Sequence, residues 1–415
     1  MDFHPQRDSL LAEVHARPST PIDPPMLVTR IAALSGPDGV AADRRHISDL
    51  CKRVGVPRAA DDAVWCAVDG GEWQLRWEKH GEFSSWTFFA KPRSKGASAS
   101  AIDSVPPAWL ETLPGSVVVL TTLVVSREDQ RPDSAPDPKE AVGARIVDGA
   151  ATLLTDLRAD AAGMTRFRLF MHVDDPILTG RIALSLLEIE SYRLMALLAF
   201  PIAQQTAARL SEIEAEAREL TEKIATHLGI DDDRDLLAKL VALSGRMEAM
   251  SASTSFRFGA ARAYHDIVQS RIASLGEQPL PGRQSMRDFM DRRLGPAMRT
   301  CASIAQREAE MISRISRAGQ MLSTRVELVT QKINADLLNS MNRRASMQLR
   351  LQRTVEGLSV AAVSYYVVSL LLIPLKAAEG RLPVDGHLVT IILVPLVVIA
   401  VWWTLRRVAG RLHDD

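Results

Sequence analysis

Hydrophobic and polar positions divide the chain into an early part of short runs and a later part of long helical periodicity. Between Met26 and Phe170, runs rich in β-branched and aromatic residues are separated by turn residues, which is typical of strands. The strands predicted in this way are Leu27–Leu34, Val64–Val68, Trp73–Glu78, Ser84–Ala90, Ser116–Val125, Gly143–Asp148, Ala151–Leu157 and Thr165–Phe170. Apolar residues at helical spacing between Asp43 and Val54 predict one helix among them. We therefore expect an α+β domain over residues 1–175.

Turn residues mark the connections within this domain. Asp69-Gly70-Gly71 and Asp148-Gly149 are typical of hairpin turns. The small polar stretch that begins at Lys91 and the proline-rich, charged stretch that begins at Arg127 predict loops.

After about Thr179 the strand pattern stops and long helical patterns follow. They span Thr179–Leu228, Asp232–Ser274 and Ser285–Thr354. Breaks are expected at Leu228-Gly229, between Gln278 and Gly282, and at Gly295-Pro296. Alanine, leucine, glutamate and arginine, which favour helix, dominate these segments. They predict a helical stalk over residues 176–356.

The last of these helices carries a narrow apolar stripe, here called the seam. Its residues are Ile304, Met311, Ile315, Ala318, Leu322, Val326, Val329, Ile333, Leu337 and Met341, with one turn taken at Glu308. The seam advances 37 residues in ten steps, or 3.7 residues per step, closer to an eleven-residue repeat than to a heptad. We expect coiled-coil partners that run straight or with a slight right-handed twist. They would come from the chain's own helices, from other subunits, or from both.

Two uncharged stretches near the C-terminus predict a transmembrane hairpin over residues 357–406. Leu358–Leu375 and Leu388–Leu405 are each eighteen residues long, close to the length that crosses a hydrocarbon core of about 30 Å. The alternative is a pair of buried helices in a soluble core. Trp402 and Trp403 are typical interfacial anchors. Only twelve residues join the stretches, so the chain must turn back there and leave a short tail at 407–415.

The distribution of basic residues predicts the orientation of this hairpin. Basic residues flank it on both sides, at Arg343, Arg344, Arg350, Arg353, Arg406, Arg407 and Arg411. The connection holds only Lys376 and Arg381, offset by Glu379 and Asp385. The positive-inside rule then places both termini in the cytoplasm. The first residues carry charges and no apolar h-region, so we expect no secretory signal.

Composition excludes several functions without indicating one. The 50 basic and 50 acidic residues balance, so we expect no nucleic-acid partner. Three widely spaced cysteines, Cys51, Cys66 and Cys301, do not form a zinc or disulfide pattern. Nucleotide-binding and hydrolase motifs do not occur in the sequence. We therefore expect no enzyme, no catalytic residues and no cofactor, and the sequence identifies no cofactor-binding residues.

Two polar stretches are candidate sites. Glu13 and His15 share a face if the N-terminal segment is extended, and His4 could join them as a third metal ligand. Local hydrogen bonding that fixes this segment to the domain is the favoured alternative.

In the second stretch, Glu78, His80 and Glu82 alternate along a predicted strand face, beside several aromatic residues. They would form a metal or substrate pocket. A hairpin with one polar face is the favoured alternative.

Five stretches carry a resemblance to a known family. They are HPQRDSLLAEVHARP, LRWEKHGEFSSWTF, LLEIESYRLMALLAFP, RRLGPAMRTC and SMNRRASMQLRLQRTVEGLSVAAVSYY. Together they resemble a family of uncharacterised bacterial membrane-anchored proteins that spans essentially the whole chain. The resemblance implies a protein of the bacterial inner membrane, and it brings no known activity, cofactor or catalytic residue.

A second resemblance concerns architecture alone. An N-terminal α/β domain, a long helix entering the membrane and a two-helix hairpin look like the CorA-type divalent-cation channels. Those channels carry a Gly-Met-Asn signature at the end of the first membrane helix, where this chain has IPLKAAEG. The departure puts the filter chemistry in doubt.

Two functions follow as hypotheses. The first is a non-enzymatic scaffold or sensor in the membrane that forms a homo-oligomer through its stalk. The alternative is a CorA-like oligomeric channel or transporter, whose first membrane helix would turn Ser359, Ser364, Tyr365 and Ser369 toward a pore. These residues could equally pack between membrane helices. An enzyme that uses Glu13 and His15, or Glu78 and His80, is the least favoured hypothesis.

Overall fold

The computed structural model describes residues 3–4, 7, 19–36, 39–92, 100–130, 142–226, 230–377 and 386–411. The chain divides into two compact units. The first unit contains Met1–His227 and Asp235–Gly319, and the second contains Leu228–Arg234 and Gln320–Asp415. The boundaries expected after residues 175 and 356 stay predictions.

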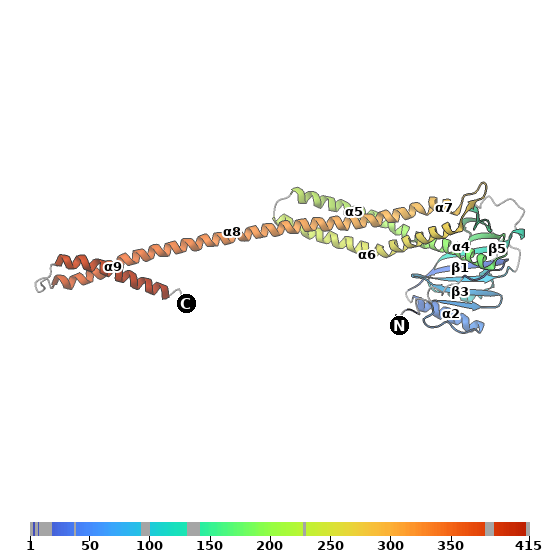
Figure 1. Cartoon of the computed structure of the whole chain (residues 1–415), viewed down its shortest axis with the longest axis horizontal. Coiled ribbons are helices and arrows are strands. Elements are labelled where there is room, and N and C mark those ends of the chain that lie inside the picture. Colours follow the sequence, from blue (N-terminus) through green and yellow to red (C-terminus); the bar gives the residue numbers. More distant parts are fainter. Residues whose placement is uncertain are drawn as a thin grey trace. The chain divides into compact units, whose positions relative to one another are not determined.

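The described strands of the first unit form one nine-stranded mixed sheet (Figure 1). They are β1 (Met26–Leu34), β2 (Trp65–Asp69), β3 (Trp73–Lys79), β4 (Phe83–Ala90), β5 (Ser116–Arg127), β6 (Val142–Ile146), β7 (Ala151–Ala159), β8 (Thr165–Met171) and β9 (Gln278–Pro279). Their order across the sheet is β2-β3-β4-β1-β5-β8-β7-β6-β9. Strands β5 and β8 pair in parallel, and the other neighbours are antiparallel. All eight predicted strands are confirmed, with ends that differ by a few residues.

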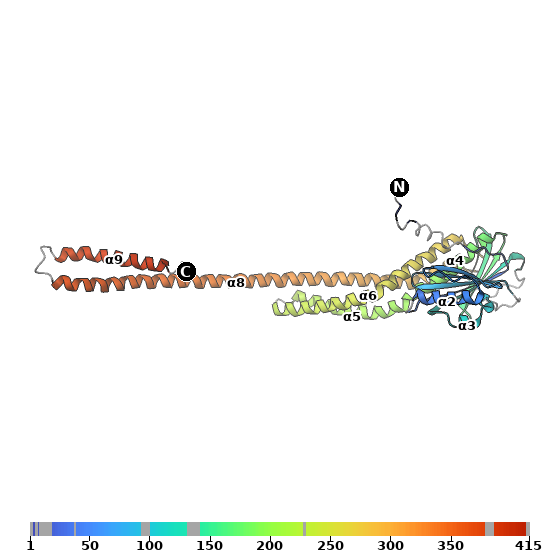
Figure 2. The same cartoon turned by 90° about the horizontal axis from the view of Figure 1, so that it is seen from below.

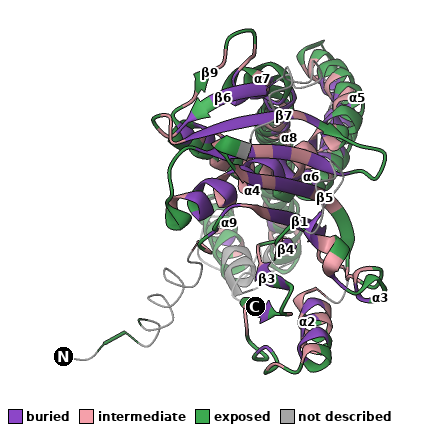
Figure 3. Cartoon of the chain, turned by 90° about the vertical axis from the view of Figure 1, so that its right-hand side faces the viewer, coloured by how far each residue is buried: buried purple, intermediate pink, exposed green. Residues whose placement is uncertain are grey.

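Helices cover both faces of the sheet, and the strands between the edge strands β2 and β9 are buried along most of their length (Figure 3). Helix α2 (Val40–Val54) packs on one face, where Trp77 and Trp86 contribute to an apolar core with Ile47 and Leu50. Helix α4 (Pro176–Leu197) covers the opposite face. Because successive side chains point to opposite faces, β3 sends Trp77 toward α2 and its neighbours Arg76 and Glu78 toward α4.

Short elements and turns complete this part. The predicted hairpin turns are confirmed: Gly71 joins β2 to β3 at φ +84°, and Gly149 joins β6 to β7 at φ +85°. The sequence did not predict the single turns η1 (Ala101–Ser104), α3 (Pro107–Leu110) and η2 (Glu128–Gln130). The expected loops fall largely outside the described residues.

The helices differ from the predicted helices in one place. The helix expected over Thr179–Leu228 is two, α4 and α5 (Ala199–Thr226). Pro201 has no N–H with which to continue the hydrogen bonds of the preceding turn, which explains the break. The expected break between Gln278 and Gly282 is confirmed, and it contains β9, a two-residue strand at the sheet edge that the sequence does not predict.

The remaining helices follow the predicted breaks. They are α6 (Ile230–Leu275), α7 (Met286–Arg293), α8 (Gly295–Ala377) and α9 (Gly386–Arg411). Helix α8 is a single element of 83 residues, and Gly357 does not interrupt it.

In the first unit, α5, α6 and the first turns of α8 pack as a bundle. Arg307 of α8 makes a bidentate ion pair with Glu214 of α5, at 3.0 and 2.7 Å. The early seam residues Ile304, Met311 and Ile315 are buried. The first half of the seam therefore finds its partners within the chain.

In the second unit, the seam changes from buried Leu322, through half-buried Val326 and Val329, to exposed residues from Ile333 onward, and the apolar end of α8 is largely exposed. Among the described residues, α8 is long and apolar enough to cross a membrane, by length and composition, and 6% of its apolar window is buried. The apolar stretch that the structure describes in α9, Thr390–Thr404, is shorter than the apolar window of α8.

One seam position in the bundle holds a buried carboxyl. Glu308 of α8 is 3% exposed, and its two oxygens lie 3.1 and 3.0 Å from the hydroxyl of Thr254 of α6. Burial raises the pKa of Glu308 above its ordinary value of 4.5, and the Thr254 hydrogen bond opposes the shift only in part. No charged group among the described residues contributes to the shift.

Replacing Glu308 with glutamine should therefore stabilise the bundle in a pH-dependent way. A carboxyl with a raised folded-state pKa binds more protons folded than unfolded, so it lowers stability as the pH rises from about 4.5 through the raised value. Glutamine removes this loss, and we expect the variant to be more stable by about 1–2 kcal/mol at pH 8 and unchanged at pH 4. Urea unfolding at the two pH values measures the difference. Exposed Glu310→Gln is the control, and an equal effect of Glu308→Gln at both pH values would contradict this account.

Candidate functional site

The structure gives no test of the N-terminal metal candidates. Glu13 and His15 lie outside the described residues, and His4 is exposed. Across the described parts of the chain, no three His, Cys, Asp or Glu side chains come close enough to hold a metal ion.

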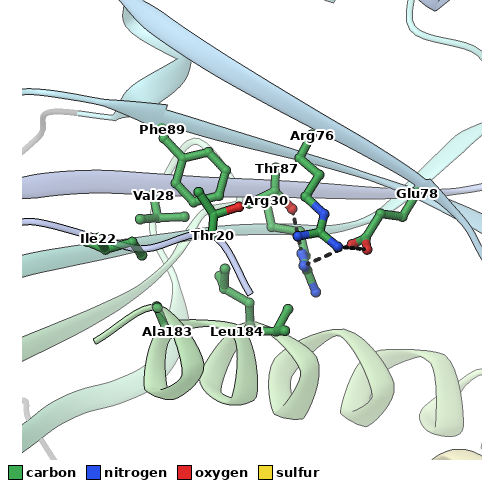
Figure 4. A pocket seen from close by; sticks show the side chains of 12 residues that line it. Thr20, Ile22, Val28, Arg30, Arg76, Glu78, Thr87, Phe89, Ala183 and Leu184 are labelled. Carbon is green, nitrogen blue, oxygen red and sulfur yellow. Dashed lines mark hydrogen bonds and ion pairs between the residues drawn. The ribbon is translucent and has the colours of Figure 1, made fainter. Parts of the chain in front are cut away.

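The second candidate stretch is divided between two places. Strand β3 ends at Lys79 and β4 begins at Phe83, so His80 and Glu82 lie in the turn between the strands. Glu78 points instead into the layer between the sheet and α4 (Figure 4). The expectation that Glu78, His80 and Glu82 share one strand face is therefore wrong, because the strand stops before the last two.

Glu78 belongs to a buried charge cluster with Arg30 and Arg76. Its carboxylate lies 2.8 Å from Nη2 of Arg76 and 3.8 Å from Nη2 of Arg30 (Figure 4). The side chain of Arg30 is 3% exposed, and its Nε donates to the hydroxyl of Thr87 at 2.9 Å. The adjoining cavity of about 20 Å³ has room for a single water molecule. We interpret the cluster as structural, because a substrate would not fit.

A larger hollow lies where the β3–β4 turn meets α4 and α6. We call it the hairpin-tip hollow. Its volume is about 440 Å³, and its lining residues are Val64, Lys79, His80, Gly81, Tyr192, Tyr264 and Ile267.

Aromatic rings form one wall of the hairpin-tip hollow. Tyr192 of α4 and Tyr264 of α6 stack with ring centroids 5.4 Å apart. The ring of His80 meets Tyr192 edge to face at 6.3 Å and stacks on Phe83 at 4.3 Å. Nε2 of His80 lies 2.9 Å from the hydroxyl of Ser85, which fixes the imidazole plane. These contacts hold the rings in place before any ligand arrives.

An ion pair joins the turn beside this wall to α6. Arg257 donates to both oxygens of Glu82, at 2.8 and 2.6 Å, and the Tyr264 hydroxyl donates to the same carboxylate at 3.0 Å. Burial, followed by the negative charge of Glu82, raises the pKa of the Tyr264 phenol. Tyr264 is therefore neutral at physiological pH and acts as a hydrogen-bond donor. A neutral phenol held by a carboxylate is poorly placed to transfer a proton. The hairpin-tip hollow is better suited to binding a ligand against its aromatic wall.

None of the three cysteines lines the hairpin-tip hollow, as far as the structure describes it. Cys51 and Cys301 are buried, and Cys66 is partly exposed. Burial raises the pKa of Cys66 to about 11, with a further contribution from neighbouring Cys51, so its thiol stays protonated. A protonated thiol is a poor nucleophile.

The hollow depends on residues that sequence reasoning did not select. Tyr192 lies within one of the stretches that carry the family resemblance, which is the signal that could have found it. Arg257 and Tyr264 gave no such signal, because they meet Glu82 only through the packing of α6 against the β3–β4 turn.

The candidate pore residues differ in their surroundings. Ser364 is 4% exposed, and its hydroxyl has no hydrogen-bond partner within the described chain. Tyr365 is 70% exposed, Ser359 is exposed, and Ser369 is partly buried. Their orientation toward a pore stays a prediction.

Comparison with known proteins identifies the family of this chain, and the description of that family states no activity. No curated protein matches the chain. Among solved structures, it is similar to the CorA magnesium transporter from Methanocaldococcus jannaschii, at 11% sequence identity, with 70% of this chain and 91% of that chain covered. The TM-score of 0.19 is too low to establish a common fold. Residues 2–412 match the family described as proteins of unknown function (DUF3422), and the chain belongs to that family.

Proposed function

We propose that this protein is a non-enzymatic scaffold or sensor, anchored in the bacterial inner membrane and self-associating through α8. The observation that carries the proposal is the change in exposure along the seam of that helix. Ile304 and Ile315 are 3% exposed, whereas Ile333, Leu337 and Met341 are 51, 57 and 58% exposed.

A second copy of the chain is the partner that best explains the exposed half of the seam. The seam keeps its 3.7-residue spacing from the buried half into the exposed half, so the same packing can continue with another helix. A contiguous apolar stripe exposed to water is unfavourable in a monomer. Two copies of α8 would cover each other's stripes at these positions.

The anchoring proposal rests on the ends of α8 and α9. α9 lies beside the last turns of α8 in both views (Figures 1 and 2). The guanidinium carbon of Arg407 lies 4.8 Å above the ring of Trp403, and arginine and tryptophan are typical of a membrane interface. We propose a transmembrane hairpin here, with both termini in the cytoplasm as the basic flanks predict.

The hairpin-tip hollow gives the scaffold or sensor a surface for a ligand or partner. Its wall presents stacked tyrosine rings and a neutral phenol, which are features of binding sites.

Aspartate at Ile333 and Leu337 should dissociate the oligomer. Two charges per chain on a buried helix seam leave several carboxylates facing each other in an apolar contact. We expect the mass measured by light scattering in mild detergent to fall from that of an oligomer to that of a monomer. The matched control is Ala335→Asp with Asn339→Asp, which adds the same two charges to the opposite, exposed face of the helix. A wild-type monomer, or an unchanged mass for the double variant, would overturn the self-association proposal.

Ion flux separates this proposal from the channel hypothesis. Oligomeric protein in liposomes should show no ion flux above that of empty liposomes if it is a scaffold or sensor. Flux that changes on Ser364→Leu would favour the channel instead.

A further inference from the structure

A second hollow lies in the helical bundle, between α6 and the α7–α8 corner. We call it the bundle groove. Its volume is about 260 Å³, and it is separate from the hairpin-tip hollow. Its lining residues are Phe258, Ala261, Arg262, His265, Asp291, Gly295, Met298, Arg299, Cys301, Ala302 and Ala305.

The floor of the bundle groove is apolar. Phe258 and Ala261 of α6 face Met298 and Cys301 of α8, and all four are at most 8% exposed. Small residues line the groove on both helices, Ala261 on α6 and Ala302 and Ala305 on α8, and they leave the space between the helices unfilled. Burial raises the pKa of the Cys301 thiol, which therefore remains neutral and adds no charge to the floor.

The mouth of the groove carries an excess of positive charge. Arg262 and Arg299 are exposed, and neither forms an ion pair or side-chain hydrogen bond with any residue that the structure describes. The single carboxylate at the mouth, Asp291, receives a long 3.5 Å hydrogen bond from Gln269. Nδ1 of His265 is buried in this region and has no hydrogen-bond partner among the described residues.

We propose that the bundle groove binds a single-chain anionic amphiphile, with its acyl chain on the apolar floor and its carboxylate or phosphate head at Arg262 and Arg299. The floor accepts methylene groups, which gain from leaving water. The two guanidinium groups supply charge-assisted hydrogen bonds to an anionic head. The volume fits a medium-length chain and excludes a two-chain lipid. This site does not depend on the proposed self-association or membrane anchoring.

Photo-crosslinking of the full chain tests the proposal directly. The protein is held in nanodiscs of zwitterionic lipid and irradiated with a decanoate analogue that carries a diazirine near the end of its chain. We expect crosslinks in the peptides that contain Phe258–Ala261 and Met298–Ala305. Decanoate and decyl phosphate should compete, whereas decanol and decyltrimethylammonium should not. Between hexanoate and decanoate, each added methylene should lower the competing concentration by up to about fourfold.

Three variants separate the parts of the site. Arg262→Gln with Arg299→Gln should weaken competition by decanoate at least tenfold, because the head loses both cationic partners. Ala302→Trp should abolish the crosslinks by filling the groove from its exposed side. Arg287→Gln with Arg293→Gln, at two exposed arginines of α7 outside the groove, is the charge-matched control and should change nothing.

Crosslinks spread over the membrane-facing helices alone, or equal competition by decanol and decanoate, would overturn the proposal. If Ala302→Trp unfolds the bundle, the chain-length series and the arginine variants still decide the outcome. Circular dichroism of each variant shows which case applies.

Discussion

Replacing Glu78 with alanine should lower the free energy of unfolding of the first unit by about 3–5 kcal/mol. Glu78 is 4% exposed, and its carboxylate is shared between the guanidinium groups of Arg30 and Arg76. Without it, two buried cations repel each other and neither regains the water that it lost on folding. Urea unfolding of the full chain in nonionic detergent measures the change, and the fluorescence of buried Trp77 and Trp86 follows this part of the molecule.

Two further variants make this prediction specific. Glu111→Gln, at an exposed position of the same unit, should change the free energy of unfolding by less than about 0.5 kcal/mol. The triple variant Arg30→Met, Arg76→Leu, Glu78→Leu should recover most of the loss, because apolar residues of similar size remove every charge at once. A triple variant less stable than Glu78→Ala would show that the cost is a packing defect. A Glu78→Ala protein as stable as the unsubstituted one would contradict the account of the cluster altogether.

The elements of the fold could largely be predicted from local pattern. Strand β4 is rich in aromatic residues and lies between turns, and the Asp69-Gly70-Gly71 turn requires the left-handed backbone that Gly71 adopts. Strand composition and turn residues each depend on only a few neighbouring residues, so both can be recognised in the sequence. The apolar pattern does not reveal the break between α4 and α5, because Pro201 lies in the first turn of α5, where proline does not disturb that pattern.

The arrangement of the strands could not be predicted in the same way. β1 lies between β4 and β5, and β5 pairs in parallel with β8, although β6 and β7 come between them in sequence. Such pairings join strand edges that lie far apart in the sequence. Nothing in the local pattern of β5 specifies its partner.

The candidate site shows the same limit more sharply. Glu78 and His80 have the chemistry of a binding site, but β3 ends between them, so they lie in different surroundings. Arg30 meets Glu78 across 48 positions, and Arg257 meets Glu82 across 175. A charged residue in a sequence does not reveal its distant partner, and that partner decides whether it binds, catalyses or only stabilises.

Replacing Glu82 with alanine should detach α6 from the β3–β4 turn and reduce the free energy of unfolding by about 2–4 kcal/mol. The side chains of Glu82 and Arg257 are 11 and 18% exposed, so water replaces their contact only in part. The Tyr264 hydroxyl would lose its acceptor as well. Glu82→Gln should cost less, because an amide oxygen still accepts from Tyr264 or Arg257.

A double-mutant cycle with Arg257→Met isolates the contribution of this contact. We expect a coupling energy above about 1 kcal/mol, because the pair is bidentate and largely desolvated. The exposed pair of Glu219 and Lys223 is the control. Its 2.6 Å separation equals the shorter of the two Glu82–Arg257 contacts, but water surrounds it, so we expect no measurable coupling. Equal coupling in the two pairs would mean that burial does not strengthen the Glu82 contact. The hairpin-tip hollow would then depend on the stacking of Tyr192 and Tyr264 alone.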